Sequence, residues 1–293
     1  MNSDPEQDFA RKMPAPLSVR RKWARVGKNV AYAVLVMYAI ISLYPFVWMV
    51  AGATKNYRQV VSSVTPIPDA TLSHFETTWT RLHFDTYLLN SIRVTGLALV
   101  LLIVVYPMAA YALAVMRFPM RGLIYGVFVA ILFVPGISVL LPLILLEHSL
   151  GLLNTRVGLT LAYINGASPL AIMLLVNYIH AIPPELRQAA QMDGASEWLI
   201  FRRVYFPLLK PALAAVALIL SVSFWNEYLF ASVSITSSER MTLPIGLQQV
   251  LSATVVHWNN VMAGSTIIVL PVIIVFLIGQ RYFFDGLTGA LKG

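Results

Sequence analysis

Cysteine is absent from the 293-residue sequence, so disulfide bonds and thiolate metal sites are excluded. Charge is also scarce: Asp, Glu, Lys and Arg make up 12% of the residues, whereas soluble domains average about 25%. The sequence has five histidines, but none of their spacings matches a metal-binding motif. We also find no internal repeat and no low-complexity linker. This composition argues against an ordinary soluble domain.

Sequence signatures of catalysis are missing as well. No Gly-x-x-x-x-Gly-Lys-Ser/Thr motif occurs, so the chain does not bind ATP through a P-loop. There is no His-Glu-x-x-His, no Gly-x-Ser-x-Gly and no pair of acids within an apolar run. We therefore predict that the chain is not an enzyme and that it binds no metal.

Long apolar runs dominate the sequence. Hydrophobic residues make up 58% of the chain, and the mean hydropathy is +0.73. A membrane-crossing helix needs about 20 mostly apolar residues, and the runs here are too continuous for the alternating strands of a barrel. We predict an all-α membrane protein with six transmembrane helices. The membrane domain covers residues 30–282, between tails 1–29 and 283–293, and its expected spans are 30–52, 89–115, 122–146, 157–180, 209–232 and 260–282.

Basic residues predict the orientation of these spans. Seven of the 21 Lys and Arg residues precede the first span, a cluster better explained by anionic lipid than by nucleic acid. With the N-terminus inside, fifteen of the 21 lie in inner segments, which favours an arrangement with both termini inside. The longest inner loop is then 181–208, between the fourth and fifth spans.

That loop is polar within an otherwise apolar chain. Pro183 and Pro184 end the fourth span, and good helix formers follow them in ELRQAAQM. Gly194 permits an abrupt turn, and Ser196 can cap a second short helix, EWLIFRRVYF. We therefore expect two short helices. Residue chemistry leaves two interpretations open: an interfacial segment that seals the bilayer surface, or a docking element for a cytoplasmic partner.

A family pattern favours the docking interpretation. The stretch ELRQAAQMDGASEWLIFRRVYFPLLKPAL resembles the EAA loop of binding-protein-dependent ABC transporter permeases. It has the paired alanines, then Asp-Gly-Ala, then the apolar-x-apolar-Pro run at Val204, Phe206 and Pro207. It departs at Gln188, where the family has a glutamate, so this position lacks the charge that a salt bridge needs. The stretches SFWNEYLFA, TLPIGLQ and DGLTGALKG resemble the MalG-like branch of carbohydrate-uptake permeases.

The resemblance implies a multi-pass transport subunit of the bacterial cytoplasmic (inner) membrane, surrounded by lipid and with no nucleic acid partner. It would import an oligosaccharide, delivered by an extracytoplasmic sugar-binding protein, by alternating access. A second homologous permease subunit would complete a heterodimer. Two ATP-binding cassette subunits would bind ATP and Mg, so this chain would hold no cofactor. The residues expected in the ATPase-coupling loop are Glu185, Gln188, Ala189, Ala190, Asp193, Gly194, Ala195, Arg202, Arg203 and Pro207.

The identity of the substrate stays open at this stage. Basic residues in the outer loops leave room for an acidic saccharide, such as a uronate oligosaccharide or a sugar phosphate, although outer acids offset them. Two other function classes are an intramembrane enzyme, with Glu227 and a histidine as acid and base, and a self-contained secondary transporter. The lack of paired acids and of internal repeats argues against both.

A second group of candidates is expected near the outer ends of the spans. Glu227 is an acid within an apolar run, which marks either a functional site or an interfacial ion pair. Trp225 can stack on a sugar ring or join the aromatic belt at the membrane interface. Asn90 can bind sugar hydroxyls or tie helices together, and Arg93 can meet an anionic substrate or extend to the interface. The expected substrate pathway comprises Trp225, Asn226, Glu227, Tyr228, Asn90 and Arg93.

Overall fold

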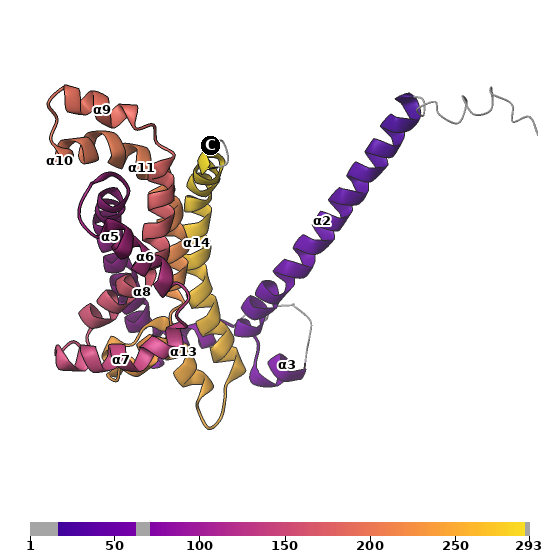
Figure 1. Ribbon diagram of the computed structural model, residues 1–293. Helices are drawn as coiled ribbons and strands as arrows, with labels where there is room; N and C mark the ends of the chain where they lie inside the picture. Colours follow the sequence, from indigo (N-terminus) through magenta and orange to yellow (C-terminus); the bar gives the residue numbers. More distant parts are fainter. Residues whose placement is uncertain (1–16, 63–70, 291–293) are drawn as a thin grey trace, which may run out of the picture.

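The computed structural model describes residues 17–62 and 71–290, with side chains described for 27–62 and 71–280. Every regular element in this part of the chain is a helix, and no strand occurs within it (Figure 1). The long helices are α2 (Leu17–Thr54), α5 (Phe84–Val115), α8 (Arg156–His180), α11 (Phe206–Trp225) and α14 (Trp258–Ala290). The prediction of an all-helical chain is confirmed.

Short helices connect the long ones. Between α2 and α8 they are α3 (Tyr57–Ser62), α4 (Ser73–Glu76), the π-helix η1 (Thr77–Arg81), α6 (Arg121–Ile131) and α7 (Gly136–Ser149). Between α8 and α11 they are α9 (Glu185–Met192), α10 (Glu197–Ile200) and the π-helix η2 (Phe201–Tyr205). Between α11 and α14 they are α12 (Leu229–Ser234), the 3-10 helix η3 (Ser238–Arg240) and α13 (Leu243–Leu251).

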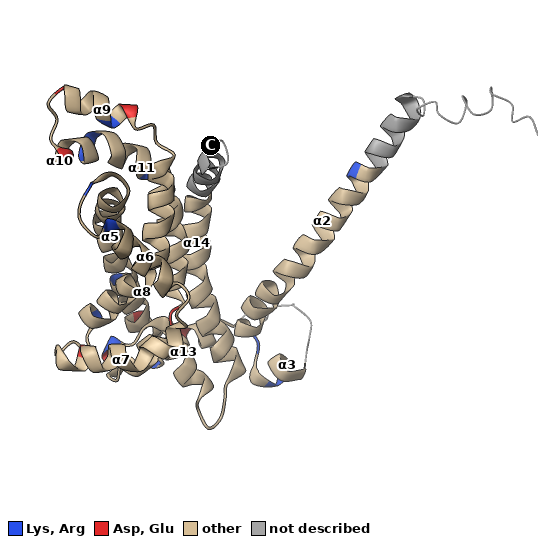
Figure 2. Ribbon diagram, in the orientation of Figure 1, with Lys and Arg blue, Asp and Glu red and all other residues tan. Residues whose placement is uncertain are grey.

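The long helices have the length and composition of membrane spans. The segments that meet this criterion within the described residues are Gly27–Thr54, Phe84–Val115, Arg156–His180, Glu197–Trp225 and Trp258–Gln280. The helices α6 and α7 meet it only when they are taken together as one bent span. Figure 2 shows that charged residues gather near the two ends of the bundle, while the middle of the long helices is largely uncharged. This distribution is typical of helices that cross a lipid bilayer.

The third expected span, residues 122–146, is two helices in the structure. Helices α6 and α7 meet at an angle of 110°. Pro135 explains the break, because it has no backbone N–H and disfavours helical geometry at the residue before it. The last turn of α6 closes instead through tight turns, in which Phe133 N–H donates to Ala130 O and Val134 N–H donates to Ile131 O, at 3.1 and 3.0 Å.

The fifth expected span, residues 209–232, is also interrupted. Helix α11 ends at Trp225, and α12 is a separate short helix. The carboxylate of Glu227 accepts the backbone N–H of Phe230 at 2.7 Å and that of Ala231 at 3.0 Å. These first N–H groups of a helix have no partner within the helix, so a carboxylate that accepts them favours a new helix start.

Helix α5 lies at the centre of the packed core. It packs against α8 and α11, and it buries Ala98, Leu102 and Tyr106 almost completely. Helix α2 differs, because it runs away from the bundle and its apolar residues over 30–46 are exposed (Figure 1). Its C-terminal end packs on α14, where a Cβ added at Gly52 would lie 2.1 Å from the sulfur of Met262. The exposed length of α2 therefore presents an apolar surface to lipid or to another subunit.

Candidate functional site

The loop between α8 and α11 forms two short helices joined by a sharp turn. Gly194 has φ +76°, a left-handed conformation that glycine adopts without strain. Its N–H donates to Gln191 O, and the N–H of Ala195 donates to Ala190 O, both at 3.0 Å. This hydrogen-bond pair is the Schellman ending of a helix. The Ser196 hydroxyl then accepts from Leu199 N–H at 3.4 Å, so the second helix has the side-chain cap expected from the sequence.

The second helix of the loop is anchored in the core by aromatic side chains. Phe201 and Tyr205 of η2 are buried, and both rings contact the ring of Tyr111 near the end of α5. The ring centroid of Tyr111 lies 5.4 Å from that of Phe201 and 4.9 Å from that of Tyr205. Such tilted and edge-on pairs are favourable beyond the apolar area that they bury. Helix α10 and η2 are therefore fixed to α5.

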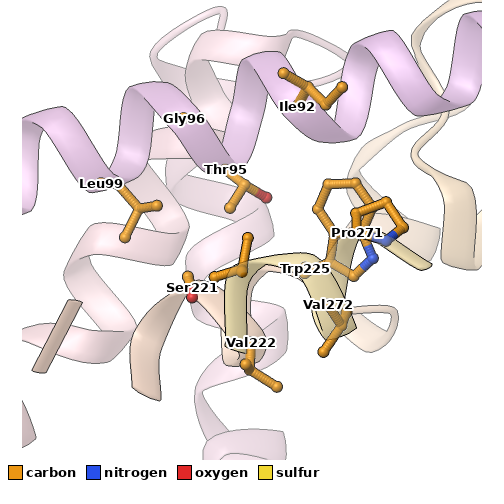
Figure 3. A pocket seen from close by; sticks show the side chains of 10 residues that line it. Ile92, Thr95, Gly96, Leu99, Ser221, Val222, Trp225, Pro271 and Val272 are labelled. Carbon is orange, nitrogen blue, oxygen red and sulfur yellow. The ribbon is translucent and has the colours of Figure 1, made fainter. Parts of the chain in front are cut away.

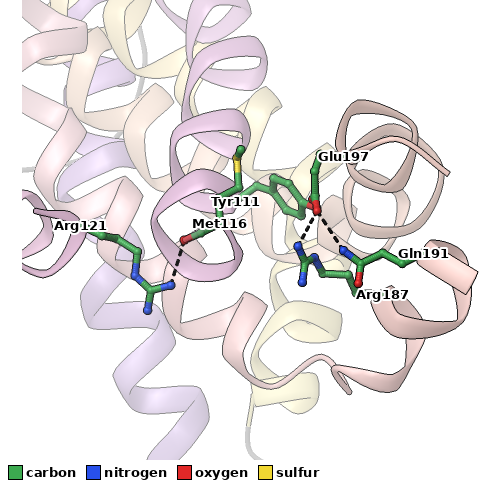
Figure 4. A network of polar contacts seen from close by, with 6 residues as sticks. All are labelled: Tyr111, Met116, Arg121, Arg187, Gln191 and Glu197. Atoms are coloured by element: carbon green, nitrogen blue, oxygen red, sulfur yellow. Dashed lines mark hydrogen bonds and ion pairs between the residues drawn. The ribbon is translucent and has the colours of Figure 1, made fainter. Parts of the chain in front are cut away.

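A polar network connects the first loop helix to this anchor (Figure 4). Glu197 Oε1 forms an ion pair with Arg187 and accepts a hydrogen bond from Gln191 Nε2 at 3.2 Å. Glu197 Oε2 accepts the hydroxyl hydrogen of Tyr111 at 2.5 Å. The hydrogen bond to Glu197 raises the pKa of Arg187 above its ordinary value, so the guanidinium stays charged. One carboxylate thus joins α9, α10 and α5.

The residues predicted for the coupling loop lie mostly on the surface. Ala190 and Ala195 are half-buried, whereas the others are exposed: Glu185, Gln188, Ala189, Asp193, Gly194, Arg202, Arg203 and Pro207. Sequence reasoning did not single out Tyr111, Arg187, Gln191 or Glu197 as site residues. The charges of Arg187 and Glu197 mark the loop in the sequence, but nothing in the apolar run around Tyr111 marks its hydroxyl.

An apolar cavity of about 230 Å³ lies between α5, α11 and α14 (Figure 3). Trp225 lines it, and the Trp225 indole N–H donates to Ile268 O at 3.0 Å. Thr95 and Ser221 also line the cavity, but the Ser221 hydroxyl already donates to Leu218 O. The cavity walls are otherwise hydrophobic, so this space suits apolar contact better than hydroxyl recognition.

The remaining pathway candidates are separated in the structure. Asn226, Glu227 and Tyr228 form the turn between α11 and α12, just beyond Trp225. Arg93 is exposed on α5, while Asn90 is fully buried there.

Asn90 has all its polar atoms engaged within the protein. Its Nδ2 donates to the carbonyl oxygens of Glu239 and Met241, both at 2.9 Å, and its Oδ1 accepts from Arg156 Nε at 2.8 Å. Asn90 therefore ties α5 to α8 and to the segment around η3, which was one of the two roles that its residue type allowed.

A second cavity, of about 280 Å³, lies at the end of the molecule opposite to α9, beside α13. Its lining is mixed, with the ring of Tyr87 and polar groups from Arg81, His83, Gln249, His257 and Asn260. Tyr87 is only 4% exposed and its ring packs against Gly246, so the amide and basic groups are what suit this cavity to polar ligands such as sugars. Among the described residues, no group of three His, Cys, Asp or Glu side chains could hold a metal ion.

Comparisons with known proteins agree with this architecture. The chain is 33% identical over 277 residues to the probable ABC transporter permease protein YurM of Bacillus subtilis, covering 94% of this chain and 91% of that protein. It is 34% identical over 279 residues to the diacetylchitobiose uptake system permease protein DasC of Streptomyces coelicolor, covering 94% and 99%.

A solved structure shows the same fold. It is the crystal structure of a bacterial ABC transporter involved in the import of the acidic polysaccharide alginate, with a TM-score of 0.76 and 27% identity, covering 88% of this chain and 97% of that one. The family described as binding-protein-dependent transport system inner membrane component matches residues 106–288. The chain therefore belongs to this family, the permease components of ABC importers.

Proposed function

We propose that this chain is the membrane-spanning subunit of an ATP-driven importer that takes up an oligosaccharide from an extracytoplasmic binding protein. Membership of the family already makes it a transport subunit rather than an enzyme. The observation that carries the proposal is the exposed helix α9, which projects from one end of the bundle together with α10 (Figure 1). An exposed, small-residue helix surface is suited to docking in a cleft of another protein.

The proposed membrane arrangement has six crossings in the bacterial inner membrane, with both termini in the cytoplasm. The bent pair α6–α7 supplies the sixth crossing beside the five long apolar helices. Helix α2 begins and α14 ends at the same end of the molecule as α9 (Figure 1). This placement supports a common cytoplasmic side for the termini and the loop, in agreement with the excess of basic residues there.

The proposed partners follow from what this chain lacks. It has no P-loop, so two ATPase subunits supply ATP and Mg binding, and α9 with its Gly194 turn docks on one of them. A second, homologous permease pairs with this one across the transport pathway, and the exposed apolar face of α2 supports such a contact. Closure of the ATPases then switches the pathway between inward and outward access.

The proposed cargo is a carbohydrate, because the relative from Streptomyces coelicolor carries diacetylchitobiose in its name. A second candidate is an acidic saccharide. The structurally similar transporter imports alginate, and the cavity beside α13 carries Arg81 with His83 and His257. Trp225 and the turn from Asn226 to Tyr228 are proposed to border the pathway, and Arg93 is proposed to face it.

Docking can be tested with the full complex purified through a tag on this chain. The substitution Ala189→Arg places a long charged side chain on the exposed face of α9, and we expect ATPase recovery to fall about tenfold or more. The matched control is Ala253→Arg, an exposed alanine at the opposite end, which should leave recovery unchanged. Unchanged recovery with Ala189→Arg would contradict the docking role of α9.

Cargo can be tested by uptake into proteoliposomes that contain the complex and its binding protein. The two probes are diacetylchitobiose and an alginate trisaccharide, each radiolabelled. Preferred uptake of diacetylchitobiose supports the neutral cargo, and preferred uptake of the alginate probe supports the acidic one. The substitution Arg81→Gln should reduce only the uptake of the acidic probe, because it removes the cation from the cavity beside α13.

A further inference from the structure

We propose, on the basis of the function above, that the Glu197 carboxylate is the link that transmits movement of the docked helix α9 to the transmembrane helix α5. Arg187 and Gln191 hold one of its oxygens from α9, and Tyr111 holds the other from α5 (Figure 4). These are positioning residues, since they face one another and not the cargo.

Helix α9 has few other attachments to the core. None of its residues is buried, and Ala190 is only half-buried where it packs against the core. Because little apolar area holds α9 in place, its orientation depends on the Gly194 turn and on side-chain contacts. Arg187 and Gln191 lie one turn apart on the same face of α9 and reach the same carboxylate oxygen. This pairing fixes the rotation of α9 about its axis.

The opposite side of the link is rigid. Tyr111 is 4% exposed, and its ring packs against the rings of Phe201 and Tyr205. A buried aromatic side chain in close-packed surroundings has little freedom to reorient. Its hydroxyl lies 2.5 Å from Glu197 Oε2, the short separation expected for a hydrogen bond to a carboxylate. Displacement of Glu197 is therefore opposed by α5 itself.

Helix α5 leads from this link to the apolar cavity between α5, α11 and α14. Thr95, which lines the apolar cavity, lies sixteen positions before Tyr111 on the same helix. At about 1.5 Å per residue this separation is about 24 Å along the helix axis. A shift imposed at Tyr111 is thus carried along α5 to the wall shared with α11 and α14.

Docking and transmission use different residues. The exposed positions proposed for docking, such as Ala189 and Asp193, take no part in the network around Glu197. Arg187 and Glu197 have exposed side-chain fractions of only 28% and 35%, so each is partly covered. Substitutions in the network should therefore leave ATPase binding intact while they loosen α9 from α5.

The experiment measures the distance between α9 and α5 in the full complex with its partner permease and ATPases. Because this chain lacks cysteine, Met192→Cys on α9 and Leu97→Cys on α5, both exposed, can carry two nitroxide labels. The partner subunits are used as cysteine-free variants, so that the two labels attach only to this chain. Pulsed electron resonance then compares the nucleotide-free complex with the complex trapped by ADP and vanadate.

We expect one narrow distance in both states of the otherwise unchanged chain, since α9 and α5 move as a unit. Glu197→Gln and Tyr111→Phe should each raise a second distance population about three- to tenfold. The matched control is Tyr205→Phe, which removes the hydroxyl of a buried tyrosine in the same cluster without removing a hydrogen bond of the network. The exchanged pair Arg187→Glu with Glu197→Arg should return the distribution toward a single distance.

Two results would overturn the link. One is a single narrow distance in both Glu197→Gln and Tyr111→Phe, with the ATPase bound. The other is loss of the ATPase from these variants, because the network would then serve docking. If the otherwise unchanged chain binds no ATPase at all, the proposed function fails and the link fails with it.

Discussion

The two ends of the bundle are held together in different ways. At the α9 end, an exposed helix contacts the core through the half-buried Ala190 and through one carboxylate, Glu197, which pairs with Arg187 of α9 and accepts from Tyr111 of α5. At the opposite end, buried side chains bind backbone carbonyls across several helices, as Asn90 does with Glu239 and Met241. The comparison teaches that α9 is held by few contacts with the core, whereas the opposite end is tied by hydrogen bonds between several segments.

The end opposite to α9 has further side-chain hydrogen bonds between segments that are far apart in the sequence. Asn154 has φ +58°, its Oδ1 accepts from Thr236 and Ser237 N–H at 3.1 Å, and its Nδ2 donates to the Ser237 hydroxyl at 2.7 Å. The buried carboxylate of Glu147 accepts from the Ser234 hydroxyl at 2.7 Å, which joins α7 to α12. These hydrogen bonds join segments that are far apart in the sequence, although Glu147 Oε1 is buried without a hydrogen-bond partner.

Among the substitutions that test this comparison, we expect the largest loss of stability at Asn90. Replacement Asn90→Leu removes the Asn90 hydrogen bonds to Glu239 O, Met241 O and Arg156 Nε, while Arg156 Nη2 still donates to Glu239 O at 3.1 Å. We expect this loss to cost about 2 kcal/mol of unfolding free energy. The control Asn226→Ala removes an exposed side chain and should cost much less. Thermal unfolding of the purified complex measures both. Equal midpoints for the two variants would show that the hydrogen bonds of Asn90 are not what holds this end.

A smaller effect is expected at Glu227, where the carboxylate accepts two backbone N–H groups at the start of α12. Replacement Glu227→Ala should cost about 1 kcal/mol, in the range of a lost helix cap. Hydrogen exchange should increase over α12 and not over α9. If exchange stayed unchanged over α12 while uptake fell, Glu227 would act in the pathway rather than in structure.

At the α9 end, Gly194→Ala should cost about 1 kcal/mol, because alanine at φ +76° is strained although the space around it is open. The matched control is Gly166→Ala in α8, which also has open space but helical geometry, and which should be neutral or stabilising. Hydrogen exchange over α9 reports the difference. Equal exchange in both variants would contradict a turn that depends on glycine.

The smallest effect on stability is expected from the exposed basic pair of the loop. The double substitution Arg202→Ala with Arg203→Ala should change unfolding free energy by no more than about 0.5 kcal/mol, since exposed positions rarely contribute more. It should nevertheless weaken ATPase binding if these side chains face the partner. Calorimetry of unfolding and a pull-down of the ATPase separate the two outcomes. A large loss of stability would show that the loop end is more tightly held than its exposure indicates.

Local patterns in the sequence predicted much of the fold. Apolar length marked the long helices, and the Gly194 turn with the Ser196 cap predicted two loop helices, because these signals act over a few residues. The same reasoning joined α6 to α7 and carried the fifth span past Trp225. Apolar composition continues across Pro135 and across Glu227, so it does not reveal where the backbone turns.

The sequence by itself determined that this is an apolar, helical, cysteine-free chain with one polar loop of the permease type. Only the tertiary structure decided which groups meet. Tyr111 and Glu197 are 86 positions apart, and Asn90 and Arg156 are 66 apart, yet each pair is hydrogen-bonded. A hydroxyl in an apolar run has no local signature of its partner, because that partner depends on how whole helices pack. The network around Glu197 and the ties of Asn90 therefore came from packing, while the two-helix loop between α8 and α11 came from the sequence.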